Sequence, residues 1–288
     1  MHTIAIYNNK GGVGKSTLTL FMADFLASLA IGGKPLRVLV IDLDAQGSSS
    51  TALLGEAVVG AARVANRSIG HLAMQLTEGE QPDLEPFLLV RPRSQSGHPP
   101  LPVVTALIPE RESIFNFDAN PLQSLTLFSQ KLRPALARTF DIVLLDLPGS
   151  LDERHLLAIN ALVMSDSIVV PVEPTRMAIH ALPDTVRMIR YAQEKNGQGR
   201  PDFLGIILNR TDRRNQQFRL HVPEMVEFFQ KTGIPCFENS LPNAPGLASA
   251  TDDTMAFSSL KDRYGNYYPH VRKVVKELFD RWQNSPQG

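Results

Sequence analysis

The chain has 288 residues, of which 43% are hydrophobic and 20% are charged, enough for a sizeable core. Lysine plus arginine and aspartate plus glutamate both total 29, so the net charge of zero gives no global electrostatic reason to bind nucleic acid. The single cysteine, Cys236, excludes a disulfide framework and a multi-cysteine metal or iron–sulfur site within one chain.

Short, nearly continuous apolar runs alternate with longer helical patterns along the chain. Strands are predicted at residues 3–8, 36–42, 140–146, 166–172 and 202–209. Helices are predicted at residues 15–31, 121–138, 153–164, 176–195 and 215–232. Strands that are apolar on both faces are typical of a parallel sheet covered by helices. We therefore predict an α/β fold with a doubly wound, mostly parallel sheet, helices on both faces, and a ligand site at the carboxyl ends of the strands.

Residues 56–120 interrupt this alternation. The segment at 91–102, RPRSQSGHPPLP, is rich in proline, serine and glycine, which argues against a helix or a central strand there. Apolar runs on either side, at 87–90 and 102–108, are candidate edge strands. We expect a single domain over residues 1–288 with an insertion or elaboration at about 56–120, where a partner would bind.

A glycine-rich loop, KGGVGKST, follows the first predicted strand at residues 10–17. Gly14, Lys15 and Ser16 fit the end of the phosphate-loop pattern G-x-x-x-x-G-K-[ST], but Asn9 replaces its first glycine. Between a strand and a helix, such glycines let backbone N–H groups surround a phosphate chain, and the helix N-terminus adds its dipole. Lys15 is then expected to reach the β and γ phosphates, and Ser16 to bind Mg²⁺. A glycine-rich turn without a ligand is the alternative.

The spelling K-G-G-x-G-K-[ST] resembles the deviant Walker A loop of the ParA/MinD family of ATPases. The resemblance implies a P-loop NTPase fold, ATP and Mg²⁺ as ligands, and slow ATP hydrolysis. In that family the early lysine crosses a dimer interface to the other subunit's phosphates, so Lys10 is expected to stabilise an ATP-sandwich homodimer; a solvated lysine without a role is the alternative. The resemblance covers about residues 1–55 and 138–282. The nucleotide-contacting residues that it implies are Gly11, Gly12, Val13, Gly14, Lys15, Ser16 and Thr17.

The segment VLVIDLDAQGSSS at residues 38–50 resembles the family's segment after the second strand. By this match Asp44 orients or activates the attacking water, while Asp42 lies in the outer shell of the magnesium ion. Ala45 stands where the family usually has proline. The assignment is chemically reasonable because phosphoryl transfer depends mostly on positioning and charge neutralisation.

Later segments extend the resemblance. FDIVLLDLPGS resembles a Walker B strand, in which Asp146 holds Mg²⁺ through water and Pro148-Gly149 begin a switch that responds to the γ phosphate. Asn209 is expected to contact adenine, and residues 233–257 resemble the family's closing strand and the loop that covers the base. The polar residues at the strand ends, expected to converge on one rim of the sheet, are Asn8, Asp42, Asp146 and Asn209.

A local basic cluster indicates a nucleic-acid partner. Residues 187–219 contain eight basic and three acidic side chains, in a chain of zero net charge. Contacts between such residues and phosphates give salt-dependent affinity without sequence preference. The predicted DNA-binding residues are Arg210, Arg213, Arg214 and Arg219. A merely solvated helix face is the alternative.

These features favour a ParA-type partition ATPase without a preceding helix-turn-helix. Its ATP dimer would bind DNA non-specifically, and a ParB-like adaptor would stimulate hydrolysis, so that plasmid or chromosomal DNA is partitioned. We expect a cytoplasmic, nucleoid-associated protein, since no signal peptide or membrane span is recognised in the sequence. A ParA-like positioner of a protein cargo is an alternative.

Two other classes of ATPase are weighed against this one. Apolar residues at helical spacing within 270–283 and basic residues around them permit a MinD-like membrane-cycling ATPase, although a helix packed on the core has the same pattern. A nitrogenase iron protein needs two cysteines per subunit to share its cluster, and this chain has one. A dethiobiotin synthetase needs a pocket for a small acid, which no residues indicate.

Overall fold

The computed structural model describes residues 1–79, 82–91, 101–120, 123–212, 216–243, 250 and 257–284. Its centre is a seven-stranded sheet of order β5-β6-β4-β7-β1-β8-β9, in which only β5 runs antiparallel to its neighbour. The strands are β1 (His2–Ile6), β4 (Val38–Asp42), β5 (Leu89–Val90), β6 (Val104–Leu107), β7 (Ile142–Asp146), β8 (Ser167–Val172) and β9 (Asp202–Leu208). The predicted mostly parallel α/β sheet is confirmed.

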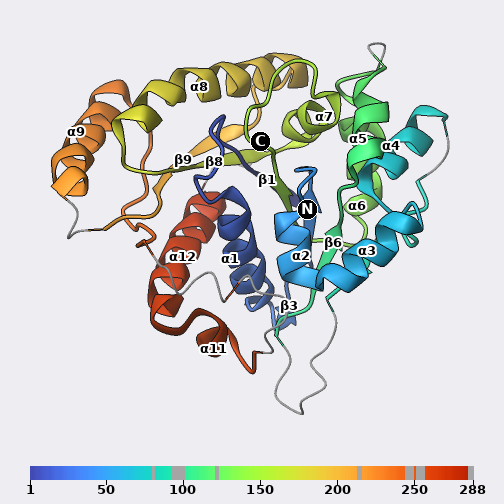
Figure 1. Ribbon diagram of the computed structural model, residues 1–288, viewed down its shortest axis with the longest axis horizontal. Helices are drawn as coiled ribbons and strands as arrows, with labels where there is room; N and C mark the ends of the chain where they lie inside the picture. Colours follow the sequence, from blue (N-terminus) through green and yellow to red (C-terminus); the bar gives the residue numbers. More distant parts are fainter. Residues whose placement is uncertain are drawn as a thin grey trace.

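Helices cover both faces of this sheet (Figure 1). On one face lie α4 (Ile69–Thr77), α5 (Arg111–Asp118), the π-helical turn η1 (Phe128–Leu132), α6 (Arg133–Leu136), α7 (Leu156–Met164), α8 (Arg176–Asn196) and α9 (Gln216–Thr232). On the other lie α1 (Lys15–Ala27), α2 (Ser48–Leu54), α3 (Glu56–Val64), α11 (Leu260–Tyr264), the 3₁₀ turn η2 (Gly265–Tyr267) and α12 (Tyr268–Asn284).

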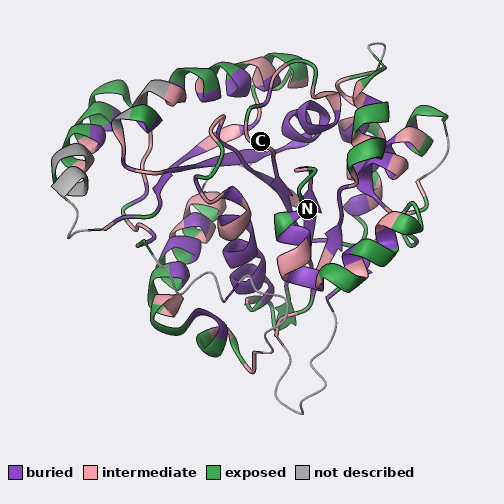
Figure 2. Ribbon diagram, viewed as in Figure 1, coloured by how far each residue is buried: buried purple, intermediate pink, exposed green. Residues whose placement is uncertain are grey.

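The strands divide their side chains between two hydrophobic cores. Ile4 and Ile6 of β1 pack with α1 and α12, whereas Ala5 between them packs with the α7–α8 side. Because successive side chains of a strand point to opposite faces, a strand between two helical layers is apolar at most of its positions. Figure 2 shows the buried sheet between helices whose outer faces are exposed. This burial explains why the apolar runs were recognisable as strands.

Residues 56–120 differ from the expectation in two ways. Their second strand, β6, lies inside the sheet between β5 and β4, so of the two strands expected at the edge only β5 lies there. The segment also forms the short helices α3, α4 and α5, which were not predicted. Residues 92–100, within the proline-rich stretch, lie outside the described residues. Since β5 and β6 complete the main sheet, this part of the chain shares its hydrogen bonding with the rest of the fold.

Other helix and strand boundaries also differ from the predicted ones. The helix predicted to run to residue 31 ends at Ala27, and a small hairpin follows, made of β2 (Ala30–Ile31) and β3 (Lys34–Pro35) around Gly32 and Gly33. Both glycines have positive φ, which explains the turn. In place of the expected closing strand and its loop, the described residues form two isolated parallel bridges, one between Cys236 and Ile206 of β9 and one between Pro242 and Thr211.

The C-terminal helix α12 packs its apolar stripe on the core. Val271, Val274, Val275 and Leu278 are buried against α1 and the sheet. The amphipathic pattern at 270–283 therefore belongs to a packed helix, which removes the main support for a membrane-cycling ATPase. Among the described residues no helix is both long enough and apolar enough to cross a bilayer.

Candidate nucleotide site

The loop between β1 and α1 has the backbone that a phosphate cradle needs. Gly12 and Gly14 have φ of 75° and 86°, in the left-handed region that favours glycine. Asn209, at the end of β9, donates from Nδ2 to the carbonyl oxygen of Val13 at 2.7 Å. A Cβ added at Gly14 would lie 2.2 Å from that Nδ2 atom. The loop is therefore held by a residue almost 200 positions away, and only glycine fits at position 14.

The two loop lysines differ in their surroundings. Lys15 is 7% exposed, and its Nζ donates to the carbonyl oxygen of Lys10 at 3.1 Å. Burial lowers the pKa of Lys15, while the nearby charges of Asp146 and Asp44 raise it. The side chain of Lys10 is partly exposed and forms no ion pair with any described residue; its backbone alone is held, through its carbonyl oxygen by Lys15 Nζ and through its N–H by Asn8 Oδ1 at 3.1 Å. The loop thus turns one amine inward and leaves the other free.

Two carboxylates face each other at the ends of adjacent strands, since Asp42 of β4 is in register with Asp146 of β7. Asp42 accepts hydrogen bonds from Ser50 N–H at 2.9 Å and Ser50 Oγ at 2.7 Å, yet burial raises its pKa to about 6. Burial, followed by the charge of Asp42, raises the pKa of Asp146 to about 7. Both carboxylate oxygens of Asp146 are buried and lack a hydrogen-bond partner among the described residues. A cation would satisfy them.

This donor set fits Mg²⁺ better than a softer metal. No group of three or more His, Cys, Asp or Glu side chains that could hold a metal occurs in the described ranges. The hydroxyls of Ser16 and Ser49 lie close enough to Asp146 to lower its pKa. Mg²⁺ takes oxygen ligands, usually one or two carboxylates together with water and substrate phosphates. The residues present fit an ion that shares its coordination with a phosphate chain.

Asp44 and Gly149 border the same loop. The carboxylate of Asp44 is partly exposed and accepts from Gln46 N–H at 3.0 Å. A Cβ added at Gly149 would lie 3.1 Å from the Cα and N atoms of Gly11 and 3.2 Å from Lys15 Nζ. The segment after β7, where a switch was expected, therefore contacts the phosphate loop directly.

The remaining predicted site residues are Asn209 and the arginines of the basic cluster. The Asn209 side chain is buried, donates to the loop and accepts from Arg210 N–H at 2.9 Å, so its contact with adenine stays a prediction. Arg210 and Arg219 are exposed, whereas Arg213 and Arg214 lie outside the described residues. Arg200, counted in the basic cluster, instead pairs internally with Asp166 at 2.6 Å.

Two residues that support the site were missed in the sequence. Ser50 binds Asp42 with both its N–H and its hydroxyl. Thr185 of α8 accepts from Asn9 N–H at 3.1 Å and donates to Asn8 Oδ1 at 3.4 Å. The serine run after Asp44 was a local signal for the first. No local pattern indicates Thr185, because it lies over 170 residues from the loop that it supports.

A doubly wound parallel sheet with a glycine-rich loop between its central strand and the first helix defines a P-loop NTPase fold. The chain belongs to the protein family described as "AAA domain", whose sequence model matches residues 1–199. The matched range includes residues 56–120, which the resemblance to ParA/MinD ATPases had left unassigned.

Known proteins confirm the kinship with ParA-type ATPases. The chromosome partitioning protein ParA of Caulobacter vibrioides is 29% identical over 220 residues, covering 75% of this chain and 72% of ParA. A complex of Cyanothece McdA with ATP has a TM-score of 0.73 at 18% identity, covering 98% of this chain and 96% of McdA. Cobyrinic acid a,c-diamide synthase from Mycobacterium smegmatis, solved with an ATP analogue and magnesium, has a TM-score of 0.70 at 19% identity, covering 99% and 96%. The two structures share the fold with this chain.

Proposed function

We propose that this protein is an Mg²⁺-dependent ATPase of the ParA type, which forms a homodimer around ATP and uses hydrolysis to time its release from DNA. The observation that carries the proposal is the pair of lysines on one loop. Lys15 is buried beside Asp146, whereas the amine of Lys10, on the same loop, forms no ion pair with any described residue and its side chain is partly exposed. A cation that its own site does not use is available to a second subunit.

Each residue of the site has a defined task in this reaction. Backbone N–H groups of the glycine-rich loop bind phosphate oxygens, and Lys15 neutralises charge on the β and γ phosphates. Ser16, Asp42 and Asp146 would hold Mg²⁺, which supplies further charge neutralisation when bound. Asp44, partly exposed at the edge of the site, orients the attacking water. Gly149 transmits the presence of the γ phosphate to the segment after β7.

The proposal includes two partners of the ATPase, DNA and an adaptor protein. The C. vibrioides relative named for chromosome partitioning supports DNA as the track and a ParB-like adaptor as the stimulator of hydrolysis. Arg210, Arg213, Arg214 and Arg219 are the proposed DNA contacts, and a nucleoid-associated location follows from them. A protein cargo positioned along DNA is the second candidate, since the same switch would serve it unchanged.

Multi-angle light scattering tests the dimer. With Mg²⁺ and a non-hydrolysable ATP analogue we expect the wild type to double its mass. Lys15→Gln is expected to lose nucleotide binding, whereas Lys10→Ala is expected to bind nucleotide and remain monomeric at concentrations at least ten times those that dimerise the wild type. Lys34→Ala, in the exposed β2–β3 hairpin, is the charge-matched control. A wild type that stays monomeric, or a Lys10→Ala variant that dimerises normally, contradicts the proposal.

A further inference from the structure

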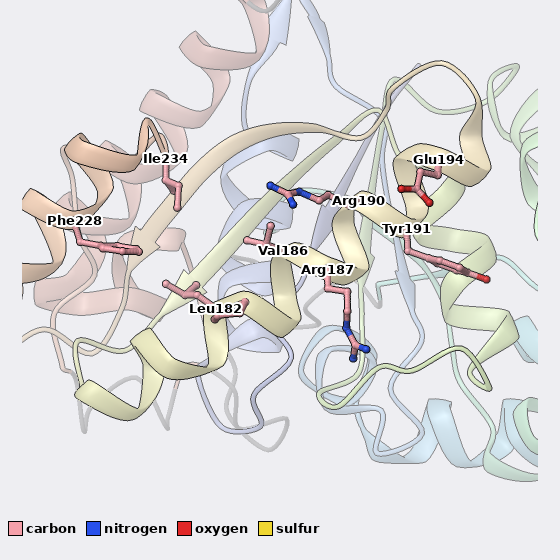
Figure 3. Close-up of a pocket in the computed structure, with 9 residues that line it drawn as sticks. Leu182, Val186, Arg187, Arg190, Tyr191, Glu194, Phe228 and Ile234 are labelled. Atoms are coloured by element: carbon pink, nitrogen blue, oxygen red, sulfur yellow. The ribbon is translucent and has the colours of Figure 1, made fainter.

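A groove of about 490 Å³ runs between α8 and α9. Leu182 and Val186 of α8 line one side, and Phe228 of α9 and the following Ile234 line the other. Figure 3 shows these four side chains directed toward one another across the gap. Phe228 is 42% exposed although it packs against buried Phe229, with ring centroids 5.9 Å apart. The groove is therefore an apolar surface that the described part of the chain leaves uncovered.

The charged side chains at the rim of the groove indicate which kind of partner could bind there. Arg190 is exposed, extends over the same edge of α8, and forms no ion pair with any described residue. The neighbouring Arg187 is held by Asp184 at 3.7 Å, one turn earlier. Glu194, one turn later on α8, also lines the groove, so the charge at this rim is mixed in the described part of the chain. Arg190 is the cation that follows Val186 by one turn, and a carboxylate is the group that complements it.

We infer that this groove binds an acidic amphipathic helix of a partner protein, with apolar side chains on Leu182, Val186 and Phe228 and a carboxylate on Arg190. A helix laid between two helices presents apolar anchors at positions i, i+4 and i+7 to such a floor. Nucleic acid is disfavoured because a phosphate backbone has no side chains to fill an apolar groove. This surface is separate from the phosphate loop, so the inference does not depend on the proposed ATPase cycle.

The groove lies one helix away from the nucleotide site. Thr185, on α8 between Leu182 and Val186, contacts Asn8 and Asn9 at the start of the phosphate loop. Since residues 182 and 186 face the groove and 185 faces the loop, a bound helix presses on an element that supports the site. A partner at this groove is therefore positioned to influence nucleotide binding.

Peptide selection on the full-length chain tests the inference. A phage-displayed library of random 16-residue peptides is selected against the wild type, and enriched peptides are synthesised and titrated by fluorescence anisotropy. We expect apolar residues at helical spacing together with Asp or Glu, and an affinity at least tenfold lower for Arg190→Glu and for Phe228→Ser. A peptide whose acidic residue is changed to Lys should regain binding to Arg190→Glu.

Matched variants keep this experiment decisive. Arg272→Glu on the exposed side of α12 controls for charge, and Val64→Ser, at an 88% exposed position of α3, controls for an apolar surface residue. Circular dichroism and basal ATP hydrolysis confirm that each variant is folded. The inference is overturned if enriched peptides are basic or bind all variants equally. It is also overturned if Arg190→Glu instead weakens DNA binding, or if Phe228→Ser alters self-association without affecting peptides.

Discussion

Gly149 is the residue at which the segment after β7 touches the phosphate loop. A methyl group there would press on the Gly11 backbone and on Lys15 Nζ at 3.1–3.2 Å. Backbone atoms cannot move aside as a flexible side chain can, so the loop must shift. We expect Gly149→Ala to lower the rate of ATP hydrolysis at least tenfold while the protein remains folded, measured by phosphate release and thermal denaturation.

The control for this prediction is Gly60→Ala on α3, where an added Cβ meets nothing within 4 Å. Alanine in a helix is favoured over glycine by about 0.5–1 kcal/mol, so this variant should be slightly more stable and hydrolyse ATP normally. Equal activity of the two variants would show that the contact between Gly149 and Gly11 has no part in hydrolysis.

The site residues that belong to a short sequence motif could be predicted from the sequence. Lys15, Ser16 and Asp146 occupy fixed places relative to a strand end or a helix start, and the fold brings them together. The tertiary roles of Thr185 and Asn209 depend on contacts across more than 170 residues, which no local pattern encodes. Burial also decided the difference between Lys10 and Lys15, and burial depends on the finished fold.

At the scale of elements, a buried ion cluster joins α1 to distant segments. Asp24 of α1 is fully buried, 2.6 Å from Arg91 and 3.4 Å from Arg263 of α11, and accepts from the Tyr264 hydroxyl. Arg263 also donates to the carbonyl oxygens of Ala52 in α2 and Ala250, each at 2.9 Å. The cluster thus ties the helix that follows the phosphate loop to both α2 and the C-terminal region.

Removing one cation of this cluster leaves buried acceptors without donors. We expect Arg263→Met to lower the free energy of unfolding by about 3 kcal/mol, because Asp24 loses one of its two buried cations and the carbonyl oxygens of Ala52 and Ala250 lose this donor. Urea unfolding at neutral pH measures this change. Arg37→Met removes an exposed ion pair with Asp141 (54% exposed at the arginine) and should cost less than about 1 kcal/mol. Similar decreases for both variants would argue against the cluster's importance.

Elements were predictable in proportion to their burial and length. The five long strands were found because both of their faces are covered, which produces unbroken apolar runs. The helices α3 and α4 have nine residues each, and α5 has eight. Helices this short obtain their stability from tertiary packing more than from their own sequence. Within 56–120 only the two apolar runs flanking the proline-rich stretch were therefore predicted as elements, and they correspond to β5 and β6.

At the scale of the whole molecule, zero net charge means that any DNA contact must come from a local surface. For the proposed interface, we expect Arg219→Glu combined with Arg210→Glu to weaken binding to random-sequence DNA. The slope of log K against log salt concentration should fall by about 1 for each phosphate that is no longer neutralised by an arginine. Fluorescence anisotropy over a salt series measures it. Arg138→Glu, exposed elsewhere, is the control, and an unchanged slope in the double variant would contradict the assignment.

The topology of the sheet has a consequence for synthesis on the ribosome. β1 leaves the exit tunnel before the other strands of the sheet, yet its two partners are β7 and β8, which begin at residues 142 and 167. At about 5–20 residues per second, an apolar strand destined for the centre of the molecule waits for many seconds without a neighbour. During that interval, nascent-chain chaperones have a clear target at the segment that will later present the phosphate loop.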